Sequence, residues 1–195
     1  MSYQTEGQWS RKRGRLEKPH ALPLTQYVQR LKQERGHNNV PDFDPEDGGV
    51  SARILLLLTS PSPHALPHTG SGFVSMDNHD STAQAVNQAI HSLSIGRASF
   101  AIWNLVPWRT ASERLTADDL VAGVRELAEL IKLLPKVEIV IATGSPADSV
   151  ADQMRAVIGG RQLMICGSPI QRGKPRAGTV TALADVLDQA RARLS

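Results

Sequence analysis

The stretch IWNLVPW, residues 102–108, is an apolar run that breaks off at Asn104 and then meets Pro107. A run of this kind predicts a buried strand, with the amide of Asn104 at the carboxyl end of that strand. An amide can both donate and accept hydrogen bonds. Because open α/β sheets bind their ligands at the carboxyl edge, Asn104 is a candidate ligand-binding residue.

Four short apolar runs along the chain predict a parallel sheet. They are ARILLLL from residue 52, SFAIWN from residue 99, VEIVIATG from residue 137 and QLMICGS from residue 162. Their apolar character is continuous rather than alternating, which is typical of parallel strands covered on both faces. Helical patterns lie over residues 82–93, 117–134, 147–157 and 179–194. We therefore expect an α/β fold, a three-layer α/β/α domain around a central, mostly parallel four-stranded sheet.

The length of the chain fits one domain with one core. It has 195 residues, of which 41% are hydrophobic, close to the usual share in globular proteins. Residues 1–23 are polar and basic and contain Gly14, Pro19 and Pro23, which predicts a flexible tail. That tail is either a phosphate-binding arm or a solubilising end. We expect residues 24–195 to form the single domain, beginning with a helix over residues 24–35.

Composition limits the chemistry and the location of the protein. A single cysteine, Cys166, excludes an internal disulfide and does not supply the thiolates of an iron–sulfur cluster or a structural zinc, so we expect no cofactor and no metal. The net charge of +3 does not by itself imply a polyanionic partner. The longest aliphatic run is far shorter than the roughly 20 residues of a membrane span, and the first residues lack an apolar signal core. We expect a cytoplasmic monomer that does not contact a membrane.

Three of the four loops that follow the strands are rich in functional side chains. They carry an aromatic ring, an amide, two carboxylates and a cationic loop: Phe73, Asn104, Asp77, Asp80, Arg172, Lys174 and Arg176. An aromatic face and an amide hold a flat heterocycle by stacking and by hydrogen bonds to its edge, while cations bind phosphates. Since these loops meet at one edge of the sheet, the sequence predicts a site for a flipped nucleobase.

Four segments keep a common order from about residue 40 to the carboxyl end: VPDFDPEDGGVSARILLLLTSPSP, SGFVSMDN, IWNLVPW and GSPIQRGKPRAG. Together they resemble the uracil-DNA glycosylase superfamily. In that family a Phe stacks on the extruded base, a strand-terminal Asn reads its edge, and a last loop carries a catalytic His and an apolar wedge. The resemblance implies that Phe73 stacks on the base, that Asn104 reads it, that Ser168 belongs to the last motif and that Ile170 is the wedge.

The chain departs from the family at both usual catalytic positions. Where the first motif usually has Asp, Asn or Glu, this chain has Thr59, Ser60 and Pro61, and the usual His falls on Cys166 or Gly167. Hydrolysis of a glycosidic bond passes through a cation-like sugar, so the site needs a negative charge or an oriented water. We therefore expect slower or redirected chemistry unless another residue substitutes.

The candidate substitutes lie in and after the first motif. Asp77 follows Phe73 by four positions, and some members of the superfamily carry an Asp in such a place. Ser60 is a candidate for positioning water, and His64 or His68 can donate to a base or a phosphate near neutral pH.

Each of these residues also has a structural interpretation. Phe73 can be a core aromatic and Asn104 a turn former, and Asp77 or Asp80 can begin the helix that follows, with Asp80 the better candidate for its cap. Arg172, Lys174 and Arg176 can form an ordinary solvated surface.

Three functions remain open on the sequence. The first is a monofunctional DNA glycosylase that removes uracil or another deaminated or damaged base in base excision repair. The second is a catalytically weak or inactive module of the same shape that binds damaged or single-stranded DNA. The third is an α/β enzyme acting on a free nucleobase or nucleoside.

Overall fold

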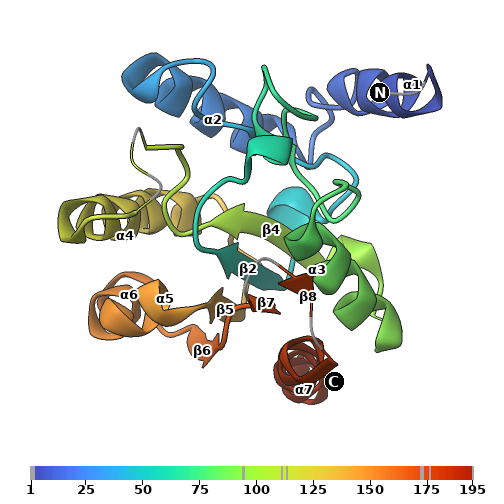
Figure 1. Ribbon diagram of the computed structural model, residues 1–195. Helices are drawn as coiled ribbons and strands as arrows, with labels where there is room; N and C mark the ends of the chain where they lie inside the picture. Colours follow the sequence, from blue (N-terminus) through green and yellow to red (C-terminus); the bar gives the residue numbers. More distant parts are fainter. Residues whose placement is uncertain are drawn as a thin grey trace.

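Four parallel strands form the central sheet of this computed structural model, in the order β4-β2-β5-β6. They are β2 (Ile54–Leu58), β4 (Phe100–Asn104), β5 (Ile139–Thr143) and β6 (Gln162–Cys166). The structure describes residues 3–93, 95–110, 112, 114–171, 174–175 and 177–194. The expected α/β fold with a parallel four-stranded sheet is confirmed (Figure 1).

Helices cover both faces of the sheet, which explains why its strands are apolar on both sides. One layer holds α2 (Leu22–Arg35), α4 (Ala117–Lys132), α5 (Ser145–Ser149) and α6 (Ala151–Val157), and the other holds α3 (Ser81–Ser92) and α7 (Ala177–Leu194) (Figure 1). The single helix predicted over residues 147–157 is two helices, because the backbone leaves helical geometry at Val150. Within the described ranges, no helix has the length and apolar character that crossing a membrane demands.

Two small sheets were not expected from the sequence. In the first, β1 (Asp42–Phe43) pairs in parallel with β3 (Phe73–Val74), in stretches for which the sequence predicted no strand. In the second, β7 (Ile170–Gln171) pairs antiparallel with β8 (Lys174–Pro175). Strands of two residues carry too little pattern for periodicity to detect. Both pairs tie down loops that surround the carboxyl edge of the central sheet.

Trp103 anchors the layer that contains α2. Its ring is 1% exposed, stacks on Phe43 at a centroid distance of 3.7 Å and meets Tyr27 of α2 edge-on at 6.5 Å. Because successive side chains of a strand point to opposite faces, Ile102 and Asn104 lie on the other face of β4, toward α3. This alternation sets the direction of the Asn104 side chain.

The amino-terminal region is not the flexible tail that its composition predicts. It forms α1 (Tyr3–Arg13), in which Trp9 is 4% exposed and Lys12 is fully buried. Trp9 and Lys12 are three residues apart and so share one helix face. That face packs on Phe73 and on an acidic cluster. These contacts hold the helix in place although the segment is mostly polar. The prediction of a flexible tail is wrong for α1.

Candidate functional site

The strands β2 and β4 end side by side at one edge of the sheet, and Asn104 is the last residue of β4. Leu58 pairs with Asn104 in the register of the two strands. Beyond that pair, the Leu105 amide donates to the Leu58 carbonyl over 2.7 Å and the Val106 amide donates to the Thr59 carbonyl over 3.0 Å. The backbone pairing thus continues past the strands and fixes the edge on which Asn104 lies.

A small pocket opens beside Asn104. Its polar wall comes from the first motif, from the loop before α3, from the first turn of α3 and from β4: Ser60, Ser62, Asn78, Asp80, Thr82 and Asn104. Its apolar wall comes mainly from β2, β3, β4 and α3, and includes Leu58, Val74, Met76, Val86 and Ile102. Apolar walls with a few fixed polar groups are the usual equipment of a site for a small organic ring.

Asn104 is the polar residue at the strand end of this pocket. It is 3% exposed, and its Nδ2 is buried with no hydrogen-bond partner among the described residues. A buried donor without a partner costs free energy, so such atoms are uncommon in folded proteins. The predicted position of Asn104 at the carboxyl end of a buried strand is confirmed, and its amide nitrogen is left unpaired by the part of the chain that the structure describes.

Asp80 and Ser62 join the two loops that border the pocket. One carboxylate oxygen of Asp80 accepts the backbone amides of Thr82 and Ala83, each over 2.9 Å, which confirms Asp80 as the cap of α3. Its other oxygen accepts the Ser62 hydroxyl over 2.8 Å. Both oxygens are engaged, so Asp80 holds the first motif against α3.

Phe73 does not face the pocket, contrary to the prediction that it and Asn104 enclose one ring. It is 1% exposed and stacks on Trp9 of α1, with ring centroids 6.1 Å apart and planes at 21°. In the short strand β3 the next residue, Val74, lines the pocket instead. Since neighbouring strand residues point to opposite sides, only one of the two can line it. The alternative interpretation of Phe73 as a core aromatic describes the structure.

Asp77, the predicted water-activating carboxylate, lies outside the pocket in an ion cluster. Its Oδ2 accepts hydrogen bonds from Lys12 Nζ over 2.6 Å and from Arg97 over 2.7 Å. Burial by itself raises the pKa of Asp77, but hydrogen bonds and charges from Lys12 and Arg97 outweigh burial and hold that pKa below its ordinary value. Asp77 is thus an ionised group whose charge is already compensated by two cations.

Sequence reasoning missed the ion cluster to which Asp77 belongs. At its centre, the fully buried Asp44 accepts hydrogen bonds from Lys12, Ser75 and Arg97. Arg97 also donates to Asp47 over 2.6 Å. The one available signal was the pairing of Trp9 with Lys12 on a common helix face in an otherwise polar segment.

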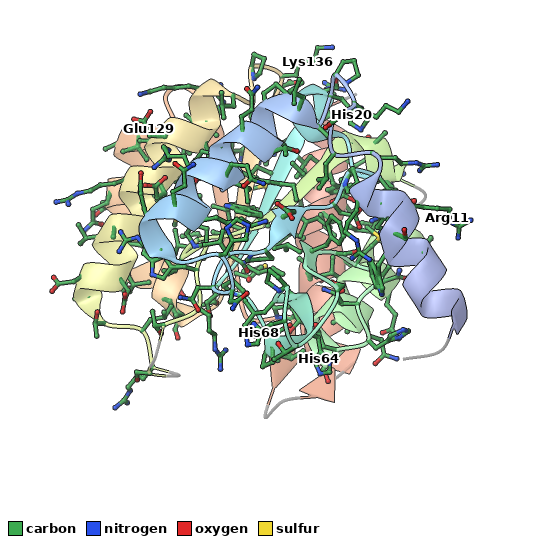
Figure 2. All side chains as sticks on the ribbon, turned by 90° about the horizontal axis from the view of Figure 1, so that it is seen from above. Arg11, His20, His64, His68, Glu129 and Lys136 are labelled. Atoms are coloured by element: carbon green, nitrogen blue, oxygen red, sulfur yellow. The ribbon has the colours of Figure 1, made fainter. Side chains whose placement is uncertain are left out.

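The remaining predicted site residues are spread along the same edge. Ser60 lines the pocket, whereas His64 and His68 are exposed, do not line it, and lie at the lower edge of the view in Figure 2. Ser168 follows β6, three strands from Asn104 in the sheet, or about 14 Å at ordinary strand spacing. Its hydroxyl accepts the backbone amide of Ile170 over 3.4 Å.

The cationic loop is only partly described. Arg172 and Arg176 lie outside the described residues, and of Lys174 only the backbone, in β8, is described. Their predicted contacts with phosphates therefore stay predictions.

Cys166, one of the two residues on which the resemblance places the usual His of the family, is a buried thiol. It is 9% exposed, and burial, together with the charge of Asp148, raises its pKa to about 11. A thiol with such a pKa remains protonated at neutral pH. Among the described residues, no three or more His, Cys, Asp or Glu side chains are arranged to hold a metal ion.

A family model described as the Uracil DNA glycosylase superfamily matches residues 45–187. The chain belongs to this superfamily. The matched region holds the central sheet, the Asn104 pocket and most of α7, whereas α1 and α2 precede it. Among curated proteins, none matches the chain significantly. In this superfamily member, Trp9 and Lys12 therefore reach the Phe73–Asp77 loop from outside the matched region.

Proposed function

We propose that the protein is a monofunctional DNA glycosylase. It takes an extruded uracil, or another deaminated or damaged base, into the pocket beside Asn104 and hydrolyses the N-glycosidic bond in base excision repair. The unpartnered Nδ2 of Asn104 in a pocket with apolar walls is the observation that carries this proposal. Membership of the superfamily supports the same reaction class.

The chemistry follows from what Asn104 donates. When the glycosidic bond breaks, the base leaves with negative charge that accumulates on its carbonyl oxygens. A donor fixed beside such an oxygen stabilises the transition state more than the ground state, and loss of one such donor costs about 3–4 kcal/mol of activation free energy in comparable sites. Asn104 Nδ2 supplies this donor, and its burial strengthens the interaction because little water competes.

Ser60 is the best-placed residue for positioning the attacking water. It lies two residues beyond β2 and lines the pocket, whereas Asp77 does not. A hydroxyl orients water but does not remove its proton as a carboxylate does. We therefore expect excision that is slow for a glycosylase and that depends mainly on stabilisation of the departing base.

The DNA contacts of the proposed enzyme involve the loop after β6. Ile170 is the wedge that fills the space of the extruded base, with Arg172, Lys174 and Arg176 on the neighbouring phosphates. The protein acts as a monomer on chromosomal DNA in the cytoplasm. His64, exposed on the loop after β2, is placed for a phosphate rather than for the base.

A second function is favoured by one specific observation. Asp77 is neutralised by Lys12 and Arg97 outside the pocket, and both oxygens of Asp80 are occupied. Neither carboxylate is then free to activate a water molecule at the pocket. This favours a module that binds a damaged or unpaired base without cleaving it.

One assay separates these two functions. End-labelled single and double strands, each with one uracil, hypoxanthine or xanthine, are incubated with protein and then with hot alkali. Strand scission that is lost in Asn104→Ala supports the glycosylase. Retention of the same oligonucleotides on the protein without scission supports the binding module, and neither binding nor scission of any lesion contradicts both.

A further inference from the structure

Among the residues that the structure describes, two side-chain amides of the same pocket each have one buried atom without a partner. One is Asn104 Nδ2, a donor, and the other is Oδ1 of Asn78, an acceptor. Both residues line the pocket, and Asn78 is only 8% exposed. Nearly all buried polar atoms find a partner within the protein. An unpaired donor and an unpaired acceptor on two residues of one pocket indicate a ligand that offers one acceptor and one donor in return.

The orientation of the Asn78 amide is fixed by its other contact. Its Nδ2 donates to the backbone carbonyl of Phe73 over 2.9 Å. A carbonyl only accepts, so the NH₂ group of Asn78 must face Phe73 and the oxygen must face away. The backbone of the β3 segment thus makes Asn78 a fixed acceptor.

We infer that Asn78 is a specificity residue whose Oδ1 accepts the ring N–H of a base whose carbonyl receives Asn104 Nδ2. The ligand class is a ring with a lactam edge, a carbonyl adjacent to an N–H, as in uracil, hypoxanthine and xanthine. This inference rests on the proposed function, because it assumes that a base enters this pocket. It assigns the recognition of the N–H to Asn78, in a loop between β3 and α3, rather than to Asn104 alone.

The same pair of atoms rejects the amino bases. Cytosine and adenine present a ring nitrogen that accepts where the lactam N–H donates, so two acceptors meet at Asn78 Oδ1. Leaving a buried polar atom opposed or unpaired costs a factor of about 10 to 100 in affinity. Because deamination of cytosine or adenine converts an amidine edge into a lactam edge, an acceptor at Asn78 distinguishes uracil and hypoxanthine from the bases that give rise to them.

Two methylated probes test the inference directly. 1-Methyluracil carries its methyl group where the sugar is attached and keeps the N3–H, whereas 1,3-dimethyluracil has no ring N–H. The dissociation constant of each is measured by titration against the full chain, Asn78→Ala and Asn87→Ala. Asn87 is the matched control because it lies on α3 outside the pocket, where its Nδ2 makes a long contact of 3.5 Å with the Met76 carbonyl.

We expect the unmodified chain to bind 1-methyluracil at least about 10-fold more tightly than 1,3-dimethyluracil. Asn78→Ala should lose this ratio through weaker binding of 1-methyluracil, and Asn87→Ala should keep it. Asn78→Ser, which stays polar but is too short to place an acceptor where the Asn78 oxygen lies, serves as a second variant if Asn78→Ala does not unfold cooperatively. A ratio preserved in the folded Asn78 variants overturns the inference, as does equal binding of both probes by the unmodified chain. Failure of the unmodified chain to bind 1-methyluracil instead contradicts the proposed function itself.

Discussion

Lys12 Nζ of α1 lies 2.6 Å from Oδ2 of Asp77, the residue that directly precedes Asn78 in the loop bordering the pocket. The amino-terminal helix therefore supports the wall of the site although it lies outside the region that matches the superfamily. Trp9, one turn earlier in α1, stacks on Phe73 of the same segment. In this protein, the ring that the family resemblance assigned to the base is buried by an element of the chain itself.

Lys12→Met should destabilise the protein. The substitution keeps the length of the side chain but removes the charge from a site where Lys12 and Asp44 are both fully buried. Breaking a buried ion pair by removal of one partner typically costs about 3–5 kcal/mol. Denaturation by urea measures the change in the free energy of unfolding. Arg13→Met, on an exposed position of the same helix, should change it by less than about 0.5 kcal/mol, and equal effects of both variants would contradict the ion cluster.

Asp77→Asn should separate structure from catalysis. Since Asp77 binds Lys12 and Arg97 rather than lining the pocket, we expect the variant to lose stability yet to bind a uracil-containing strand as the unmodified chain does. Fluorescence anisotropy at a temperature where both proteins are folded measures the binding. If excision occurs and Asp77→Asn abolishes it without weakening the fold, Asp77 is catalytic after all.

The sequence predicted the central architecture because that part of the fold depends on strong, continuous patterns. Four apolar runs and the helices between them are long enough for periodicity to identify, and the position of Asn104 followed from the end of one run. Asp80 was likewise predictable as a cap, because an acidic residue directly before a helix is a local signal.

The residues that sequence reasoning misplaced depend on contacts between distant segments. Phe73 and Asp77 look like site residues in a loop, and only α1, more than sixty residues earlier, shows that they pack on Trp9 and Lys12. The free acceptor of Asn78 is equally hidden, since it results from a side chain bound to the Phe73 carbonyl. Local composition carries no information about such pairings.

Asp47 should make stability fall as pH rises. Burial, aided by the charge of Asp44, raises its pKa to about 8 although Arg97 lies beside it. In the unfolded chain the pKa returns to about 4, so the folded state binds the proton more tightly, and the contribution of Asp47 is present at low pH and lost as pH rises through about 8.

Comparison with Asp47→Asn isolates this contribution. Because the amide does not titrate, the unmodified chain should lose about 1.4 kcal/mol per pH unit relative to the variant between about pH 5 and about pH 8. Urea denaturation at several pH values gives the difference. A constant difference across that range would show that Asp47 is ionised in the folded protein.

Gly123→Ala should disturb the pocket from a distance. A Cβ on Gly123 of α4 would lie 2.4 Å from the carbonyl oxygen of Leu105, the residue after Asn104, so the helix or the strand end must move. Overpacking of this kind costs about 1–3 kcal/mol, and we expect weaker binding of a uracil-containing strand as well. Gly160→Ala, whose Cβ has no neighbour within 4 Å, is the control and should change neither property.

The most direct test of the central claim, that Asn104 meets the base, compares two strands that differ only at one position. The dissociation constants of a uracil-containing strand and of its cytosine counterpart are measured for the unmodified chain, Asn104→Leu and Asn87→Ala. The leucine keeps the volume of the side chain but neither donates nor accepts. We predict that the unmodified chain and Asn87→Ala prefer uracil by at least about 10-fold and that Asn104→Leu shows a clearly smaller preference, because only the contact of Asn78 remains. An undiminished preference for uracil in a folded Asn104→Leu variant would contradict the account.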